Sequence, residues 1–134
     1  MPVYTCTAPQ GTLTGESKAA LAAEITRIHA AVNHVPPAYV NVIFSEPPRE
    51  NVFAGGVPGA PLIITGWARR GHPQEDTTRL ALELSAAAVR VTGVEENHVM
   101  VVIEDSPARS AVEGGRVLPE PGEEKAWLAR RGEA

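Results

Sequence analysis

The chain has 134 residues, of which 43% are hydrophobic and 21% are charged. This length and composition predict one globular domain and exclude a disordered chain or a multidomain assembly. Its 12 basic and 16 acidic residues give a net charge of −4, and no basic stripe runs along the sequence. We therefore expect no nucleic-acid partner.

The single cysteine, Cys6, cannot form a disulfide within the chain, which is typical of a reducing compartment. Its place in an alternating strand favours a small buried apolar side chain over a nucleophile. No apolar run approaches the roughly 18 to 20 residues of a membrane span, and the N-terminus lacks the basic and apolar regions of a leader. The expectation is a cytoplasmic protein with no membrane partner.

The first part of the chain predicts a β-α-β unit. Residues 3–7 form a short β-rich run, and Thr14 is a suitable cap for a helix that continues to about Asn33. Two prolines end this helix, and the almost continuously apolar residues 40–44 predict a buried strand.

The same order of elements follows a stretch rich in Pro and Gly. Residues 62–65 predict a strand, and Pro73 is placed as the first residue of a helix that ends at Gly93. Residues 98–103 predict a fourth strand. The spacing between matching elements is nearly constant, since starts at 3, 14 and 40 correspond to starts at 62, 73 and 98.

This spacing predicts an α/β (α+β) fold built from duplicated β-α-β units. The expected architecture is a four-stranded sheet with two helices on one face. Within this single domain, 1–134, the expected parts are a first repeat at about 2–46, a linker at 47–61, a second repeat at about 62–104 and a C-terminal segment at 105–134. The charged end of that segment is typical of a tail helix.

Pro2 directly follows the initiator methionine. Removal of Met1 would leave a secondary amine at the head of a strand, where it could act as a base, an acid or a nucleophile. An α-amino group ordinarily titrates near 7.7 to 8.0, and burial or a nearby cation would move its pKa towards neutrality. Met-Pro is also a common chain start, so further residues have to support this interpretation.

Four further segments carry a resemblance to a known family. They are ITRIH ending at His29, residues 51–56 (NVFAGG), residues 66–71 (GWARRG), and residues 112–116 (VEGGR) followed by LPEPG. With Pro2 and the duplicated unit, their order and spacing make the chain resemble the tautomerase superfamily. The more specific resemblance is to the group of cis-3-chloroacrylic acid dehalogenase, and it spans nearly the whole chain.

By that resemblance, Pro2, His29, Arg69 and Glu113 match functional positions of the dehalogenase. Pro2, Glu113 and His29 are then catalytic, with Pro2 delivering a proton, Glu113 activating water and His29 donating to the substrate. The substrate-binding group is Arg69, joined by His72 and Arg70. The resemblance also implies a homotrimer, no cofactor and a small carboxylate as substrate.

The chain departs from the dehalogenase pattern at two functional positions. His72 stands where the family has a second arginine, and Val102 stands where it has a tyrosine. His72 could either replace part of the anion binding or cap the second helix. Arg70 replaces an acid, and the sequence leaves open whether it faces the pocket. Loss of a hydroxyl donor can cost about 10²- to 10³-fold in rate, so we expect weak dehalogenation.

The residue types themselves support carboxylate chemistry. Arg69 offers a planar guanidinium that can bind a carboxylate through two hydrogen bonds. Glu113 precedes two glycines, which allow a tight turn that brings its carboxylate over a pocket. His29 shares a helix face with Leu21 and Ile25, so it is either a buried structural residue or a donor to the substrate.

The expected activity is that of a cofactor-independent tautomerase, a keto-enol isomerase with hydratase or dehalogenase side activity, on small 2-oxo or unsaturated carboxylic acids. Two alternatives remain. A malonate semialdehyde decarboxylase of the same superfamily would require an aspartate where the chain has Ala38-Tyr39. A noncatalytic ligand-binding domain of the same fold would apply if Met1 is retained. The histidines lack zinc-motif spacing, so we expect no metal.

Overall fold

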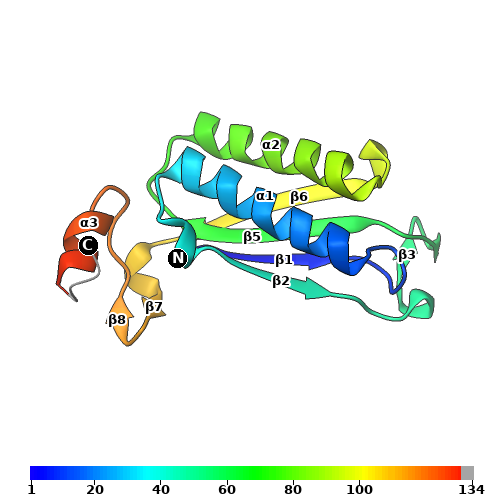
Figure 1. Ribbon diagram of the computed structural model, residues 1–134, viewed down its shortest axis with the longest axis horizontal. Coiled ribbons are helices and arrows are strands. Elements are labelled where there is room, and N and C mark those ends of the chain that lie inside the picture. Colours follow the sequence, from blue (N-terminus) through cyan, green and yellow to red (C-terminus); the bar gives the residue numbers. More distant parts are fainter. Residues whose placement is uncertain (131–134) are drawn as a thin grey trace.

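The computed structural model describes residues 1–130, whose centre is a four-stranded sheet. The strands β1 (Val3–Thr7), β2 (Asn41–Ser45), β5 (Leu62–Arg69) and β6 (Val99–Ser106) lie in the order β2-β1-β5-β6. Strand β1 pairs parallel with β2, β5 pairs parallel with β6, and β1 and β5 are antiparallel. Both long helices cover one face (Figure 1), which confirms the predicted sheet and helix arrangement.

The two helices begin and end at recognisable residues. Helix α1 (Gly15–Asn33) starts with a capping box in which the Ser17 N–H donates to Thr14 Oγ1 at 3.0 Å, and His34 ends it in the left-handed conformation. Helix α2 (Gln74–Thr92) ends at Gly93, whose φ is 75°. Pro73 occupies the position just before α2 and not its first residue, a difference of one residue from the prediction.

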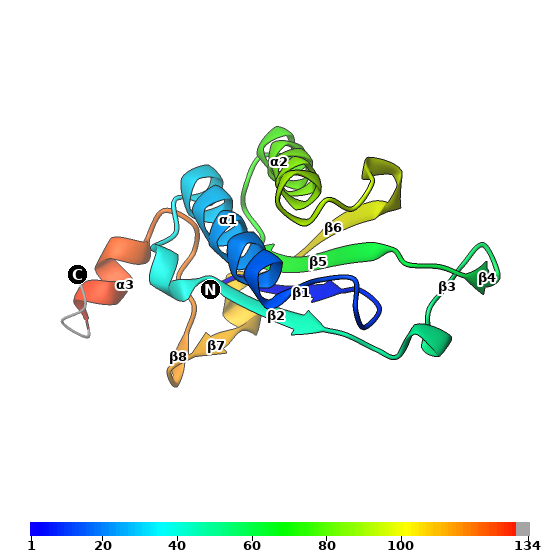
Figure 2. The same ribbon diagram turned by 45° about the vertical axis from the view of Figure 1, so that its right-hand side comes forward.

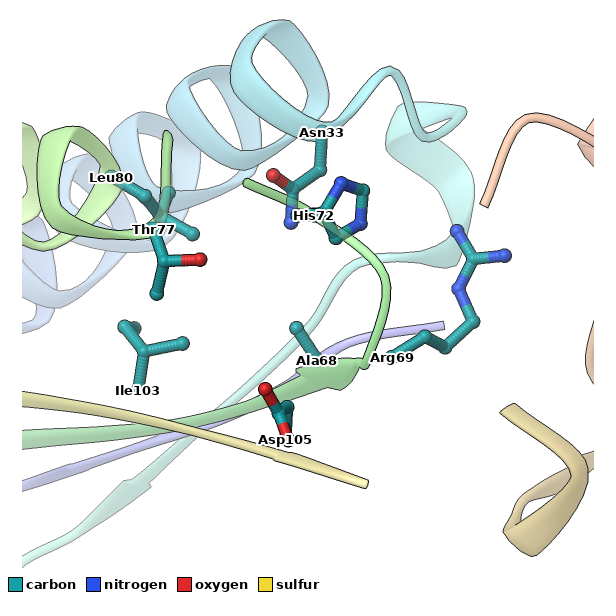
Figure 3. A pocket seen from close by; sticks show the side chains of 8 residues that line it. All are labelled: Asn33, Ala68, Arg69, His72, Thr77, Leu80, Ile103 and Asp105. Atoms are coloured by element: carbon teal, nitrogen blue, oxygen red, sulfur yellow. The ribbon is translucent and has the colours of Figure 1, made fainter. Parts of the chain in front are cut away.

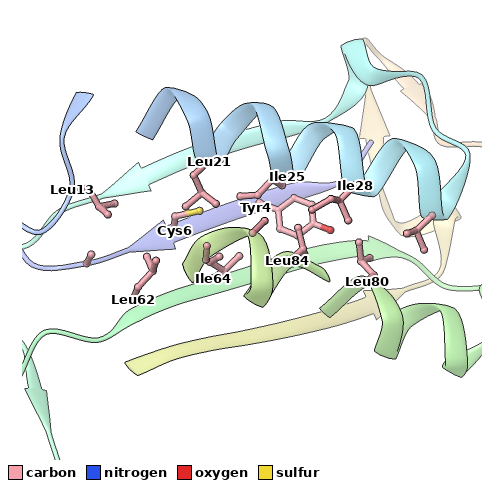
Figure 4. Packing of buried hydrophobic residues seen from close by; sticks show 14 residues of the cluster. Tyr4, Cys6, Leu13, Leu21, Ile25, Ile28, Leu62, Ile64, Leu80 and Leu84 are labelled. Carbon is pink, nitrogen blue, oxygen red and sulfur yellow. The ribbon is translucent and has the colours of Figure 1, made fainter. Parts of the chain in front are cut away.

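The main core lies between this helix pair and the sheet. Tyr4 and Cys6 point from β1 into the helix layer, and the alternation of β1 and β5 places further apolar side chains beside them. Figure 4 shows the labelled members of this cluster: Tyr4, Cys6, Leu13, Leu21, Ile25, Ile28, Leu62, Ile64, Leu80 and Leu84. The Tyr4 ring fits because residue 66 is glycine, where a Cβ would lie 2.3 Å from Tyr4 Cε1.

Strands β5 and β6 are longer than the predicted 62–65 and 98–103. Their parallel pairing continues to the pair Arg69 and Ser106, because the backbone ladder is satisfied despite the glycine and the charged residues in these segments. The extra length carries Arg69 to the end of the sheet at which β1 begins, since Val3 pairs with Trp67.

Short hairpins and a short helix lie at the ends of the sheet. Figure 2 shows the hairpin of β3 (Phe53–Ala54) and β4 (Val57–Pro58) at one end, and that of β7 (Val112–Glu113) and β8 (Arg116–Val117), with α3 (Glu124–Ala129), at the other. Within residues 1–130, short 3-10 turns connect the elements: η1 (Pro37–Tyr39), η2 (Arg49–Asn51), η3 (Glu96–His98) and η4 (Ala108–Ser110).

Part of the predicted tail helix is therefore α3, whereas residues 131–134 lie outside the described residues. Across residues 1–130, no helix is both long enough and apolar enough to cross a membrane.

Candidate functional site

The chain start is held at the end of the sheet where β5 finishes. Pro2 is fully buried, and its carbonyl accepts a hydrogen bond from the Asn41 N–H at 3.1 Å. This bond extends the parallel pairing of β1 and β2 by one step. The first residues of the chain are thereby fixed in a packed environment.

Met1 occupies the interior of this end of the molecule. Its side chain is 2% exposed and packs in a second apolar cluster with Val35, Leu118 and Trp127. Its amino group donates to the Tyr39 carbonyl and lies 3.1 Å from Oε1 of Glu113. Burial lowers the pKa of this amino group, the hydrogen bond and charge of Glu113 oppose that shift, and Arg69 adds to it.

Glu113 reaches the amino group from a tight hairpin. Gly114 and Gly115 connect β7 to β8 with φ angles of 61° and 77°, which side chains other than glycine rarely adopt. An open cavity of ≈ 410 Å³ adjoins the pair, and Met1, Glu113 and Trp67 are among its lining residues. The two glycines therefore place a carboxylate at the amino end of the chain, where the sequence predicted a pocket.

Arg69 is buried at the same end and is held by the C-terminal segment. Its Nη1 donates to the Pro119 carbonyl at 2.6 Å, and its Nη2 donates to Glu124 Oε1 at 2.7 Å. Burial on its own would raise the pKa of Glu124, but hydrogen bonds from Arg69 and from the Gly122 N–H lower it. Glu124 is thus a carboxylate at 7% exposure, paired with an arginine at 3%.

His29 is buried beneath this region. Its Nδ1 is 2.7 Å from the Tyr4 hydroxyl and its Nε2 is 3.4 Å from Asn33 Nδ2. Burial is the main reason that the pKa of His29 falls to about 3, with smaller effects from His72, the terminal amine and Arg69. His29 is therefore neutral at physiological pH and hydrogen-bonded within the core.

His72 lies next to Arg69, but in a different, smaller cavity. The cavity has a volume of ≈ 20 Å³, and Asn33, Arg69 and His72 are among its lining residues (Figure 3). This volume suits about one water molecule and is too small for a substrate. Helix α2 begins without a side-chain cap, so His72 does not cap it, and burial and Arg69 lower the pKa of His72.

Arg70 is exposed and paired with Asp105. Its Nε donates to Asp105 Oδ1 at 2.9 Å, and both side chains are exposed. The structure thus gathers Met1, Pro2, Glu113 and Arg69 at one end of the sheet. His29 and His72 lie close to this group.

Several residues at this end had no recognised signal in the sequence. Glu124 lies in a charged tail, and nothing in its spacing indicates a partner at Arg69. Tyr4 follows the strand alternation of a core residue, so its bond to His29 is not apparent. Arg116 packs its guanidinium 3.6 Å from the centre of a Trp127 ring and donates to the Trp127 carbonyl.

The arrangement suits proton transfer next to a bound carboxylate. An amine and a carboxylate lie in contact, and a buried guanidinium is nearby. Within the part of the chain that the structure describes, no three His, Cys, Asp or Glu side chains are grouped to hold a metal ion. Cys6 is fully buried, and burial raises the pKa of its thiol to about 12.

Known structures share this fold over most of the chain. The crystal structure of N1, a member of the cis-3-chloroacrylic acid dehalogenase family, has a TM-score of 0.91 and 27% identity, covering 95% of this chain and 90% of that chain. The crystal structure of native Ps01740 has a TM-score of 0.81 and 34% identity, covering 83% and 99%.

A fused 4-OT asymmetric trimer has a TM-score of 0.79 and 26% identity, covering 86% of this chain and 94% of that chain. No curated protein sequence matches the chain. The family model Tautomerase_3, "Putative oxalocrotonate tautomerase enzyme", matches residues 1–132. The predicted membership in the tautomerase superfamily is confirmed, and the chain belongs to the Tautomerase_3 family.

Proposed function

We propose that this chain, once Met1 is removed, is a cofactor-independent tautomerase that acts on small 2-oxo or unsaturated carboxylic acids. The observation that carries the proposal is the distance of 3.1 Å between the buried terminal amine and the half-buried Glu113 carboxylate. Related structures belong to tautomerase and dehalogenase families, which supports an enzymatic role.

The volume occupied by Met1 becomes the substrate site in this proposal. Loss of Met1 frees Pro2 as a secondary amine and opens space between its nitrogen and Glu113. Burial is the main reason that the pKa of the Met1 amine is lowered, and burial beside Arg69 would act in the same direction on the Pro2 amine. A neutral amine can take the enol proton and return it to carbon, while Arg69 binds the substrate carboxylate.

Hydration is a weaker side activity in this proposal. Glu113 would activate water for addition to a double bond, with Pro2 supplying the proton to the adjacent carbon. Val102 is half-buried and lies on the sheet face opposite the helices, next in sequence to Val101, which packs against the core. It has no hydroxyl to orient water, so we expect slow turnover of 3-haloacrylates.

The packing of Met1 also favours a second candidate, a noncatalytic ligand-binding domain. A retained Met1 would keep its buried place, and the Pro2 nitrogen would be an amide without basicity. Intact-mass spectrometry separates the two functions, because active material that still carries Met1 would rule out the proline mechanism.

The test of the tautomerase is the ketonisation of phenylenolpyruvate by the chain that begins at Pro2. We expect Pro2→Ala to slow ketonisation by about 10²-fold or more, since it changes the amine that transfers the proton. The Arg70→Ala variant is the matched control, because Arg70 is exposed and paired with Asp105. Unchanged ketonisation in Pro2→Ala would refute the mechanism.

We also propose that the protein assembles as a homotrimer through the sheet face that the helices leave open. Val3, Ile43 and Met100 are 41%, 56% and 57% exposed on that face. An apolar sheet face of this kind is usually covered by another chain, and related structures include fused 4-OT trimers. Light scattering should give three times the chain mass, and a monomer would contradict the proposal.

A further inference from the structure

The C-terminal segment places a carboxylate of the chain itself on the arginine that would bind the substrate. Glu124 accepts from Arg69 Nη2 at 2.7 Å and from the Gly122 N–H at 3.0 Å. The Pro119 carbonyl, in the same segment, accepts from Arg69 Nη1. Both partners are buried, so their charges are poorly screened by water.

We propose that Glu124 is a specificity-determining residue that restricts the site to monocarboxylates. This inference rests on the proposed function, in which Arg69 binds the substrate carboxylate. Arg69 has five N–H donors, and the C-terminal segment uses one on each terminal nitrogen. The remaining donors can bind a carboxylate, but the positive charge of Arg69 is already balanced by Glu124.

The other charged groups at this end of the sheet are balanced in the same way. In the chain that retains Met1, the terminal amine is paired with Glu113. His29 and His72 both have lowered pKa values, chiefly because of burial, and so contribute little positive charge at pH 7. Arg116 is engaged with the Trp127 ring and carbonyl.

A second carboxylate on a ligand would therefore enter a site that already holds the negative charges of Glu113 and Glu124. Arg69 is already paired with Glu124, so it supplies no uncompensated positive charge to a second carboxylate. The electrostatic repulsion between Glu124 and the bound ligand should be about twice as large for a dianion as for a monoanion.

The experiment compares two ligands that differ by one carboxylate, 2-oxopentanoate and 2-oxopentanedioate. Their dissociation constants are measured by titration calorimetry on the chain that begins at Pro2, on Glu124→Gln and on Glu123→Gln. Glu123 is exposed and adjacent, so it is a matched control for the loss of one charge. The proposal requires that wild type binds the monocarboxylate more tightly than the dicarboxylate.

In Glu124→Gln we expect about threefold tighter binding of the monocarboxylate and about tenfold tighter binding of the dicarboxylate. Glu123→Gln should leave both constants within about twofold. Equal changes for the two ligands, or no change, would overturn the inference while leaving the proposed function intact. If wild type binds neither ligand, the proposed function itself fails.

In Glu124→Gln, Arg69 is buried without its charged partner, and this can lower the stability of the variant. Two further measurements keep the test decisive in that case. Thermal unfolding with each ligand reports binding even at low stability, and 2-oxopentanedioate should raise the midpoint of Glu124→Gln more than 2-oxopentanoate does. Glu124→Asp keeps the charge and shortens the side chain, so its preference should stay like that of wild type. If Glu124→Asp instead shows the ligand preference of Glu124→Gln, the effect depends on side-chain geometry and not on charge, which contradicts the proposal.

Discussion

The amino group of Met1 lies 3.1 Å from the Glu113 carboxylate, although one residue begins the chain and the other is in the hairpin that follows the last sheet strand. Two features position the contact: the bond from the Asn41 N–H to the Pro2 carbonyl, and the glycine turn that orients Glu113. The contact identifies the end of the sheet at which proton transfer is proposed, and it leads to the following predictions.

Glu113→Gln should separate the two proposed chemistries. The amide cannot activate water as a base, so hydration of 3-haloacrylates should fall by about 10²-fold or more. Ketonisation depends on the Pro2 amine and should stay within a few-fold of wild type. Steady-state rates on phenylenolpyruvate and cis-3-chloroacrylate provide the measurement, and an equal loss of both rates would contradict the separate roles.

Arg69→Lys should raise the KM for the substrate by about tenfold or more with a smaller effect on kcat. Lysine retains the charge but lacks the planar fork that contacts both Pro119 and Glu124. Denaturant unfolding of the same variant monitors folding, because the change also weakens a buried ion pair. Arg70→Lys is the exposed control and should have the KM of wild type. A similar rise in KM in both variants would contradict the proposed role of Arg69 in binding the substrate.

The free energy of unfolding of the protein should decrease as the pH is lowered, and His29 should account for part of this decrease. Its pKa is about 3 in the folded state and about 6.5 when unfolded, so the unfolded chain binds more protons between these values. Stability from the neutral imidazole is complete above about pH 6.5 and is lost as pH falls towards 3, with a slope of at most about 1.4 kcal/mol per pH unit.

Urea unfolding from pH 7 to pH 4 measures this dependence, with His29→Gln as the comparison. Glutamine keeps a hydrogen-bond partner for Tyr4 but has no titrating group. The free energy of unfolding of the variant should therefore depend less on pH than that of wild type. Parallel curves would show that His29 is not buried in its neutral form.

Gly66→Ala should lower the free energy of unfolding by about 1–3 kcal/mol. The new Cβ would lie 2.3 Å from Tyr4 Cε1, so the ring must move and its bond to His29 must lengthen. Gly15→Ala is a control because a Cβ there meets nothing within 4 Å. Thermal unfolding of both variants checks the difference, and equal stability would contradict the close packing of Tyr4 against the β5 backbone.

Much of the fold follows from local patterns in the sequence. The apolar stripe of α1, the Thr14 cap and the Gly93 stop are local features, and the helices begin and end within about a residue of prediction. The ends of β5 and β6 were harder to predict, because their last residues are held by pairing between strands and not by strand propensity.

The site was predictable where a residue is local to a motif, and less so where it depends on contacts between distant segments. Pro2 and Glu113 were singled out from short motifs, and the structure places the Met1 amine, next to Pro2, 3.1 Å from Glu113. Whether Arg70 faces outward, and which side chain balances Arg69, depends on how β6 and α3 pack. Such pairings are tertiary, so single-residue patterns do not encode them.

The most direct test of the account compares the same chain with and without Met1 in the ketonisation of phenylenolpyruvate, with each mass verified by spectrometry. The chain that begins at Pro2 should be faster by about 10²-fold or more, because only it has a free secondary amine and an emptied site next to Glu113. Equal rates for the two forms would contradict the central role of Pro2.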